Sequence, residues 1–386
     1  MEEGGNPNYG VRPHIAMVIS TMAAGGAERV ISILGNHWVG RGFKVSIITL
    51  SCSSADHYVL SPEICRVKLN LMGDSANYWQ KLKNNIRRLR EIRGSVRKLD
   101  PDVVISFIED TNIRVMLALT GMKVPVIVSE RTDPRHYDVG GLRRGLRRWL
   151  YRHAQAVVVQ TESVRFWALD FLRAGVVHVI PNPVTPWVGD AEVKAISLAN
   201  GRNIFAMGRM CREKGFDLLV EAYAKSGVMQ RGWKLVILGD GRERQALKDM
   251  AGRLGVSGGM EMPGTVREPR AWFRAGGVFV LSSRFEGFPN ALLEAMAEGL
   301  PCIAFDCESG PNEIIRKNVD GLLVPAGDVD AMATAIERLA SDEQLRAKLA
   351  QRTSEVLQRF SLERIASRWE DLFIKKAGNE QTRNRS

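Results

Sequence analysis

Short apolar runs alternate with amphipathic stretches along most of the chain. Runs in which Val, Ile and Leu occupy successive positions predict strands buried on both faces of a parallel sheet. In the first half these runs are residues 14–20, 44–50, 103–107, 124–129, 156–160 and 178–180. In the second half they are residues 204–207, 234–238, 278–281 and 303–305.

Amphipathic stretches separate these strands, and their apolar residues recur at steps of three and four, which predicts helices. The longest has one apolar face made by Trp79, Leu82, Ile86, Leu89, Ile92, Val96 and Leu99. Further helices are predicted over residues 28–39, 216–224, 242–252 and 290–298. Strands and helices that alternate in this way indicate an α/β fold built on doubly wound parallel sheets.

The periodicity fades over residues 181–202, where Pro181, Pro183 and Pro186 crowd together, and then restarts. A length of 386 residues also favours two domains. We therefore predict a first domain over residues 1–184, a linker over 185–202 and a second domain over 203–360. Residues 361–386 are expected to form a closing helix with a loose tail.

The net charge of +11 is concentrated in two segments of the first domain. Residues 81–100 hold eight Lys or Arg against two acidic residues, and residues 131–152 hold seven Arg against two Asp. Such basic surfaces attract phosphates of nucleic acids, anionic lipids or pyrophosphate-linked substrates. In residues 141–152 one helix face carries Leu142, Leu146, Trp149 and Leu150, which predicts either contact with a membrane surface or ordinary core packing.

Several classes of protein are disfavoured by the residues present. Five cysteines without a CxxC pair argue against a disulfide framework or a zinc knuckle and favour a reducing compartment. Neither a secretory leader nor an apolar run long enough to span a membrane is evident. The pairs Asp100/Asp102 and Asp328/Asp330 lie at predicted element boundaries and are better explained as capping residues than as metal ligands.

Two glycine-containing loops between a strand and a helix are candidate anion sites. Gly25 and Gly26 would let backbone N–H groups approach an anion at a helix N-terminus, although two such glycines are often only a tight turn. Gly208, Arg209 and Lys214 follow the strand at 204–207. The two cations could straddle a diphosphate and offset the charge that grows on a leaving phosphate.

The most specific pattern is a pair of carboxylates, Glu286 and Glu294, separated by seven residues that include Gly287, Phe288 and Pro289. Here a loop runs into a helix that starts near Asn290. Backbone N–H groups of residues 287–290 would hold phosphate oxygens, and Glu294 could accept hydrogen bonds from two vicinal hydroxyls, as a ribose offers.

These segments resemble the GT-B glycosyltransferases of glycosyltransferase family four, and the resemblance covers nearly the whole chain. Its motifs are residues 25–30, 180–184, 208–215, 238–241, the Glu286/Glu294 pair, 310–315 and 320–325. Residues 128–134 are similar to the branch that builds bacterial surface glycans on lipid carriers. The resemblance implies two Rossmann-like domains facing a cleft, an acceptor-binding first domain, a nucleotide-sugar-binding second domain and a last helix that crosses back to the first.

The resemblance also implies a role for each matching residue. Arg209 and Lys214 would clamp the donor diphosphate, Glu286 would lie by the transferred sugar, and Glu294 would hold the ribose. The other donor-binding residues implied are Gly25, Gly26, Val266, Arg267, Gly287, Phe288, Asn290 and Ala291. The expected activity is retaining transfer of a hexose or N-acetylhexosamine from a UDP-sugar to a lipid-linked or cell-surface glycan, with no metal or other cofactor.

One feature departs from the family pattern, because many relatives place a histidine near the sugar and this chain shows no counterpart. Glu109, Glu130 and Arg131 are the candidates for acceptor binding. The alternatives are a UDP-sugar epimerase or a phosphorylase on the same scaffold, a nucleotide-dependent oxidoreductase, and a nucleic-acid binder, for which no recognition motif is present. The expected location is cytoplasmic, peripheral at the inner face of the cell membrane and in contact with its anionic surface.

Overall fold

A computed structural model describes residues 12–51, 56–71, 77–136, 140–186, 201–266 and 268–383. The chain divides into two compact units. The amino-terminal unit comprises Met1–Ile180 and Leu362–Ser386, and the carboxyl-terminal unit comprises Pro181–Ser361. Residues 187–200, most of the predicted linker, lie outside the described residues.

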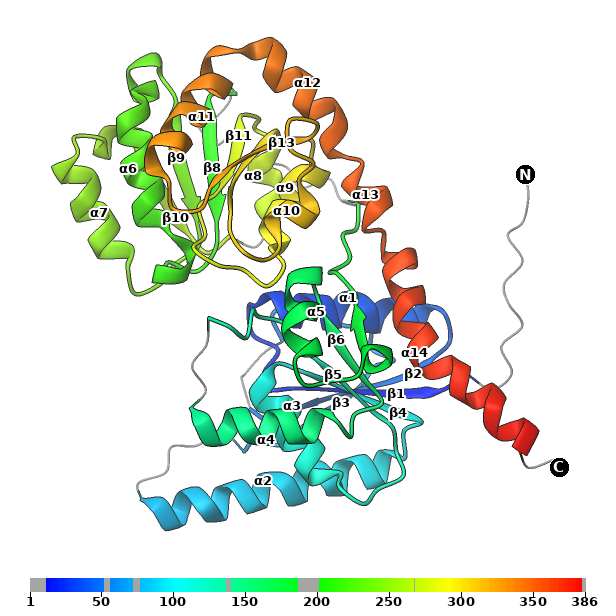
Figure 1. Cartoon of the computed structure of the whole chain (residues 1–386). Coiled ribbons are helices and arrows are strands. Elements are labelled where there is room, and N and C mark those ends of the chain that lie inside the picture. The colour runs from blue at the N-terminus through cyan, green and yellow to red at the C-terminus, as the bar shows by residue number, and fades with distance from the viewer. Residues whose placement is uncertain are drawn as a thin grey trace, which may run out of the picture. The chain divides into compact units, whose positions relative to one another are not determined.

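The amino-terminal unit is built on a seven-stranded sheet with the order β3-β2-β1-β4-β5-β6-β7, and all its pairings are parallel (Figure 1). Its strands are β1 (His14–Ile19), β2 (Lys44–Thr49), β3 (Cys65–Lys68), β4 (Val103–Phe107), β5 (Val126–Ser129), β6 (Ala156–Val159) and β7 (Val177–Val179). The order reverses between β1 and β4, which makes the carboxyl ends of these two strands the topological switch point.

Helices cover both faces of this sheet. They are α1 (Gly26–Gly40), α2 (Tyr78–Leu99), α3 (Glu109–Ala118), α4 (Gly141–Tyr151), α5 (Glu162–Leu169) and α14 (Leu362–Arg383). One core joins α1 and α14 to one face of the strands, and a second core joins α2, α3, α4 and α5 to the other. The central strands are buried on both faces, which explains their continuous apolar runs.

The closing helix α14 packs on the amino-terminal unit, as the sequence predicted (Figure 1). Phe373 meets the edge of Trp38 in α1 at a centroid distance of 5.9 Å. Glu370 accepts a 3.1 Å hydrogen bond from the Trp38 indole and pairs with Arg41 at 3.0 Å. This buried acid is therefore satisfied by the helix on which it packs.

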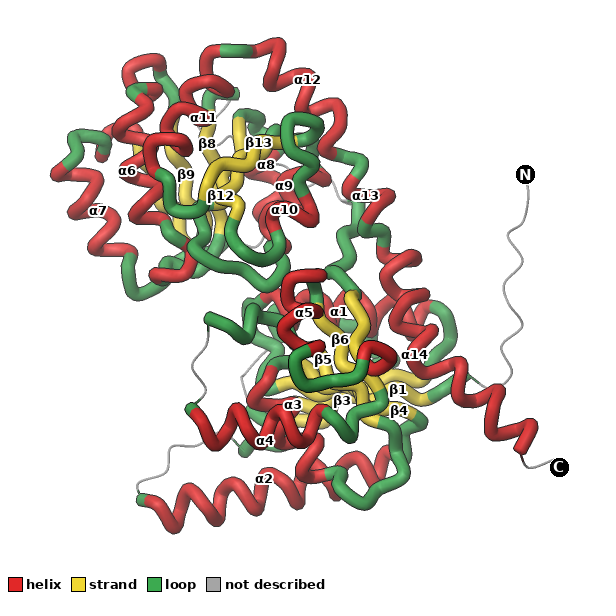
Figure 2. The backbone as a smooth tube through the Cα atoms, viewed as in Figure 1, coloured by secondary structure: helices red, strands yellow, loops and turns green. Residues whose placement is uncertain are grey.

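The carboxyl-terminal unit holds a six-stranded parallel sheet of order β10-β9-β8-β11-β12-β13, with helices on both faces (Figure 2). Its strands are β8 (Asn203–Met207), β9 (Lys234–Leu238), β10 (Met260–Gly264), β11 (Val278–Leu281), β12 (Cys302–Asp306) and β13 (Gly321–Pro325). Its helices are α6 (Phe216–Ser226), α7 (Arg244–Arg253), α8 (Pro269–Phe273), α9 (Asn290–Ala297), α10 (Pro311–Ile314), α11 (Val329–Ser341), α12 (Glu343–Thr353) and α13 (Val356–Arg359).

The predicted fold class is confirmed, since both units are Rossmann-like and carry every predicted strand. The pattern did not predict β3, β10 and β13, and all three are edge strands. In β3 and β10 no residue is fully buried. A strand at an edge is covered less than a central one and so lacks the continuous apolar run. Strand β13 is mostly buried, and this explanation does not apply to it.

Candidate donor and acceptor sites

The strongest candidate site lies at the switch point of the carboxyl-terminal sheet, where β8 and β11 are neighbours. The loop after β8 carries Arg209 and Lys214, and the loop after β11 carries Glu286. Two motifs about 75 residues apart in sequence thus meet because parallel strands end at one edge of the sheet. Ligands of open α/β sheets bind at this point.

An ion pair joins these two loops. Lys214 Nζ lies 2.7 Å from Glu286 Oε1, and the Ser283 hydroxyl donates to the same oxygen at 2.6 Å. The Ser282 hydroxyl donates to the Lys214 carbonyl at 2.9 Å. The lysine is half-buried and Glu286 is buried, whereas Arg209 is exposed to solvent. This sheet edge thus carries one cation held in an ion pair, Lys214, and one exposed cation, Arg209.

Glycines allow the loops after β8 and β9 to approach each other at this edge. Gly208 N–H donates to the Leu238 carbonyl at 3.0 Å, and Met210 N–H donates to the Asp240 carbonyl at 2.8 Å. A Cβ on Gly239 would lie 2.0 Å from the Gly208 carbonyl oxygen, and Gly239 has a φ of +129°. The 238–241 motif therefore has a structural cause, which is that only glycine fits against the neighbouring loop.

The second carboxylate, Glu294, lies in α9 with 3% of its surface exposed. Asn290 is the first residue of that helix, and the Pro289 carbonyl accepts from Leu292 and Leu293. The segment 287–290 thus leads directly into a helix N-terminus, where backbone N–H groups favour anions. Ala291 is half-buried in the same helix.

Of the predicted donor-binding residues Val266 and Arg267, the structure describes only the first. Val266 is half-buried and packs against the core that contains α9. Arg267 lies outside the described residues. The structure therefore brings Arg209, Lys214, Glu286 and the α9 residues to one sheet edge, with Val266 on the same core as α9.

In the amino-terminal unit, Gly25 and Gly26 lie at the switch point after β1 and begin α1. Gly25 caps the helix, and a Cβ on it would meet the Glu28 carboxylate at 2.1 Å. The Tyr58 hydroxyl donates to the Gly25 carbonyl at 3.0 Å. A carboxylate thus already lies at the helix end where the sequence predicted a phosphate.

Of the three candidate acceptor residues, Glu109 is the most accessible. It opens α3 after β4, and its carboxylate is 3.8 Å from Arg143 Nη2 of α4. Its other oxygen, Oε1, is buried with no hydrogen-bond partner among the described residues. A carboxylate with this mixture of exposure and unmet hydrogen bonding can accept a donor from a ligand.

Glu130 is instead enclosed, with 1% of its surface exposed. Its carboxylate accepts a hydrogen bond from Tyr151 of α4, whose oxygen accepts from Asn112 Nδ2 of α3 at 3.1 Å. Burial raises the pKa of Glu130 to about 7, although the charge of Arg147 and the Tyr151 hydrogen bond act against the rise. Tyr151 contacts Glu130, and Asn112 contacts Tyr151, only through the tertiary fold, so no local motif in the sequence indicates either residue.

Arg131 is buried against aromatic rings. Its guanidinium carbon lies 5.1 Å from the centroid of Phe107 and 5.8 Å from that of Trp369 in α14. Burial lowers the pKa of Arg131 to about 9. This cation–π packing ties β5 to the closing helix and is the position that the structure gives to the predicted acceptor residue.

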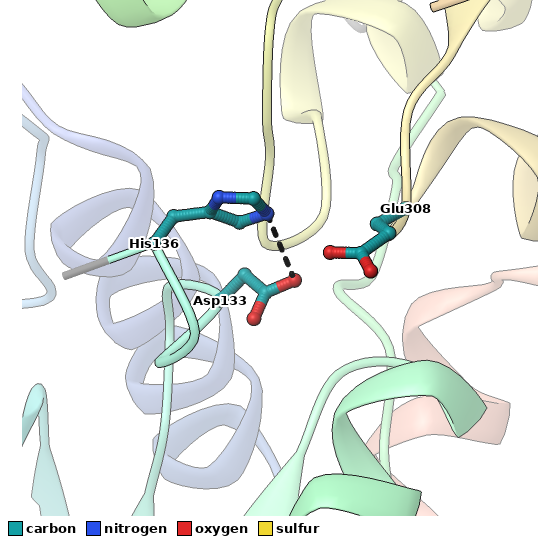
Figure 3. A group of neighbouring side chains, drawn as sticks. All are labelled: Asp133, His136 and Glu308. Atoms are coloured by element: carbon teal, nitrogen blue, oxygen red, sulfur yellow. Dashed lines mark ion pairs between the residues drawn. The ribbon is translucent and has the colours of Figure 1, made fainter.

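The acidic groups near this sheet edge are largely engaged with protein partners. Asp133 accepts from Arg135 at both carboxylate oxygens and lies 4.0 Å from His136 Nε2 (Figure 3). The third residue drawn, Glu308, belongs to the carboxyl-terminal unit. In the predicted boundary pairs, Asp102 accepts from the His14 N–H at 2.6 Å, and Asp328 caps α11 by accepting from Ala331 N–H at 2.9 Å.

The two basic segments form α2 and α4, and both present apolar side chains to solvent. Trp79 is 75% exposed, and Leu82 and Ile86 on the same face of α2 are exposed as well. In α4, Leu142 is 89% and Trp149 is 53% exposed, whereas Leu150 belongs to the core. Ordinary core packing therefore accounts for only part of each apolar face.

Two family models match the chain in succession. Residues 24–187 match the model described as Glycosyltransferase Family 4, and residues 201–342 match that described as Glycosyl transferases group 1. Among the described residues, we find no helix that is both long and apolar enough to cross a bilayer.

Individual proteins are similar over different shares of their length. An exopolysaccharide phosphotransferase of Streptomyces coelicolor is 32% identical over 73% of this chain, but the match covers only 29% of that protein. The Campylobacter jejuni α-1,4-N-acetyl-D-galactosaminyltransferase named for a diNAcBac-PP-undecaprenol-linked substrate is 28% identical over 92% of this chain and 96% of its own length.

Among solved structures, HepE of Anabaena in complex with UDP and glucose has a TM-score of 0.78 at 16% identity. The match covers 94% of this chain and 100% of HepE, and it establishes similarity of fold. Taken with the two family models and the pair of Rossmann-like units, these similarities identify the chain as a glycosyltransferase of the GT-B fold.

Proposed function

We propose that the chain transfers a hexose or N-acetylhexosamine from a UDP-sugar to a lipid-linked bacterial glycan, with retention of anomeric configuration and without a metal ion. The observation that carries the proposal is the Lys214–Glu286 ion pair at the β8/β11 switch point, next in sequence to the segment that leads into α9. The UDP complex of HepE, a protein of the same fold, supports the choice of donor nucleotide.

Each residue at this edge has a distinct part in the proposed reaction. Arg209 and Lys214 would offset the negative charge that builds on the diphosphate as the sugar–phosphate bond breaks. Backbone N–H groups of Phe288 and Asn290 would hold phosphate oxygens, and Glu294 would hold the ribose hydroxyls. Two cations and a helix N-terminus could together replace the charge that a metal supplies in other transferases.

Retention would follow if the acceptor hydroxyl attacks the anomeric carbon on the same face from which the leaving group departs. In that mechanism the leaving phosphate oxygen takes the proton of the acceptor hydroxyl, so no side chain has to act as the base. Glu286 would lie by the transferred sugar, where its ion pair with Lys214 fixes its position. Glu109, the most exposed of the three candidate residues, is the proposed acceptor contact.

A membrane-bound acceptor is supported by the surface of α2 and α4. Exposed tryptophans beside exposed arginines are typical of segments that lie at a lipid–water interface. Each basic residue near an anionic membrane contributes about 1 kcal/mol, so a handful suffices for reversible attachment. The Campylobacter relative, whose name gives an undecaprenol-linked substrate, is consistent with this class of acceptor.

The donor proposal is tested by calorimetric titration of UDP, GDP and ADP into the full chain, first without metal and then with EDTA. We expect UDP to bind most tightly and EDTA to leave its affinity unchanged. Preference for GDP would redirect the donor class, and no binding of any nucleotide would overturn the proposal. Product NMR with the donor found would then report whether the anomeric configuration is retained.

Glu294→Ala tests the ribose contact within the same experiment. Loss of hydrogen bonds to both hydroxyls should weaken UDP binding by about 1–3 kcal/mol. UDP affinity equal to that of the wild type would exclude this role for Glu294.

A further inference from the structure

Two segments connect the units, and both contact the proposed donor-binding segment 287–290. The chain leaves the amino-terminal unit at Ile180–Pro181 and returns to it at Ser361–Leu362. Within the carboxyl-terminal unit these connections pair with each other, since Val184 N–H donates to the Phe360 carbonyl at 2.9 Å. Val184 and Phe360 share one core with Phe288.

The first connection makes the polar contacts. Asn182 is almost fully buried, and its Nδ2 donates to Asn290 Oδ1 at 2.6 Å and to the Phe288 carbonyl at 3.3 Å. One carboxamide therefore holds a backbone carbonyl of the segment and the side chain that begins α9. A buried carboxamide in this position fixes orientation because each lost bond would leave a polar group unsatisfied.

The other contacts hold the rest of the segment. The Ser309 hydroxyl donates to the Gly287 carbonyl at 3.2 Å, and the Phe288 ring meets the edge of Phe360 at 5.5 Å. Because C=O and the following N–H point in opposite directions across a trans peptide, anchoring the Gly287 carbonyl directs the Phe288 N–H away from Ser309. The direction of the Phe288 N–H, a proposed hydrogen-bond donor to phosphate, is thus set by its surroundings.

We propose that Asn182 is a positioning residue for donor binding, which acts through Asn290 and the Phe288 carbonyl. The inference rests on the proposed function of segment 287–290 and adds a residue that the motif comparison left without a role. It also means that donor binding stabilises the first connection, since a ligand that fixes Asn290 fixes the partner of Asn182 as well.

The test is a double-mutant cycle on UDP affinity with Asn182→Ala, Asn290→Ala and the double variant. Asn182→Ala should raise the UDP dissociation constant about tenfold, as expected for the loss of one or two buried hydrogen bonds. Because the two side chains act together, the double variant should lose little beyond Asn290→Ala alone. Fully additive losses would overturn the proposed route through Asn290.

The matched control is Asn36→Ala. Asn36 also makes two side-chain hydrogen bonds, to the Val59 carbonyl at 2.9 Å and from Ser61 N–H at 2.8 Å, but in the amino-terminal unit. It should leave UDP affinity unchanged. If Glu294→Ala weakens UDP binding while Asn182→Ala does not, the positioning role fails and the donor site stands.

A second measurement separates positioning from general loosening. Hydrogen exchange of the Val184 amide, which is bonded to Phe360, should slow in the wild type when UDP is added. In Asn182→Ala, saturating UDP should no longer slow this amide. An equal slowing in both proteins would overturn the coupling.

Discussion

The two units bury charged side chains near the carboxyl ends of their strands in different ways. In the carboxyl-terminal unit the buried acid Glu286 is matched by Lys214 and Ser283 at hydrogen-bond distance, and the loops are fitted together by glycines. In the amino-terminal unit Glu130 and Arg131 follow β5 and are both buried, Glu130 under a hydrogen bond from Tyr151 and Arg131 against the rings of Phe107 and Trp369, and burial displaces the pKa of each.

This difference follows from what each site is proposed to bind. A diphosphate has a constant charge and shape, so the residues that bind it can be fixed by short local motifs. The amino-terminal residues are held through tertiary contacts with α3, α4 and α14 instead. Packing of this kind can change from one acceptor to another without altering any short motif.

The largest effect is expected at the Lys214–Glu286 ion pair of the carboxyl-terminal unit. Lys214→Ala removes the cation nearest to Glu286 and should lower kcat about 10³-fold, as for loss of one group that stabilises transition-state charge. The readout is steady-state kinetics with the donor found by titration. Lys225→Ala, which removes a surface pair with Asp330 in the same unit, is the control and should keep wild-type turnover. Comparable loss in both variants would contradict the assignment.

Two glycine substitutions, one in each unit, compare how closely the loops at the two sheet edges are packed. Gly239→Ala places a Cβ against a backbone carbonyl at a positive φ and should cost more than about 3 kcal/mol of stability. In Gly25→Ala the clash is with the end of the Glu28 side chain rather than with backbone, and φ is −168°, so the change should cost less than about 1 kcal/mol. Urea unfolding of the full chain measures both, and equal costs would contradict the comparison.

The same contrast explains what the sequence could predict. The central strands and the helices that face the cores were predicted because each depends on a local pattern, whereas the roles of the donor residues stay predictions. The acceptor side was predicted only as three candidates, since Glu130 is bonded by Tyr151, 21 residues away, and its burial arises from packing. The α2 face that begins at Trp79 has the period of a core helix, yet only its second half, with Ile92 and Val96, is buried.

Glu130 gives the next effect in size. Its pKa rises from 4.5 to about 7 on folding, so the native state holds the proton more tightly than the unfolded chain. The contribution of Glu130 to the free energy of unfolding is fully present below pH 4.5 and is lost as the pH rises through 7, a change of about 3 kcal/mol. Glu130→Gln keeps an acceptor for Tyr151 and removes the titration, so the difference in stability from wild type should grow in its favour toward pH 8.

The free energy of unfolding is measured by urea unfolding at pH 5 and pH 8. Hydrogen exchange of peptides from β5 and α4 at the same two pH values reports the local stability around Glu130. Asp217→Asn serves as the opposite case, because its hydrogen bonds with Arg284 lower the pKa of Asp217 and its contribution is lost as the pH falls. A Glu130→Gln protein whose stability follows the wild-type pH profile would show that Glu130 is already ionised in the native state.

The smallest effect concerns the exposed face of the amino-terminal unit. Replacing Trp79 and Trp149 by Ala should lower binding to phosphatidylglycerol vesicles about tenfold, because each indole removes apolar area from water at the interface. Phe166→Ala is the matched control, since this ring is 65% exposed on α5, outside the basic helices α2 and α4. It should change binding by less than about twofold if exposure alone is insufficient and nearby cations are required. Loss of wild-type vesicle binding at high salt would support the contribution of the basic residues. Equal losses from the phenylalanine and tryptophan variants would contradict a specific membrane contact through α2 and α4.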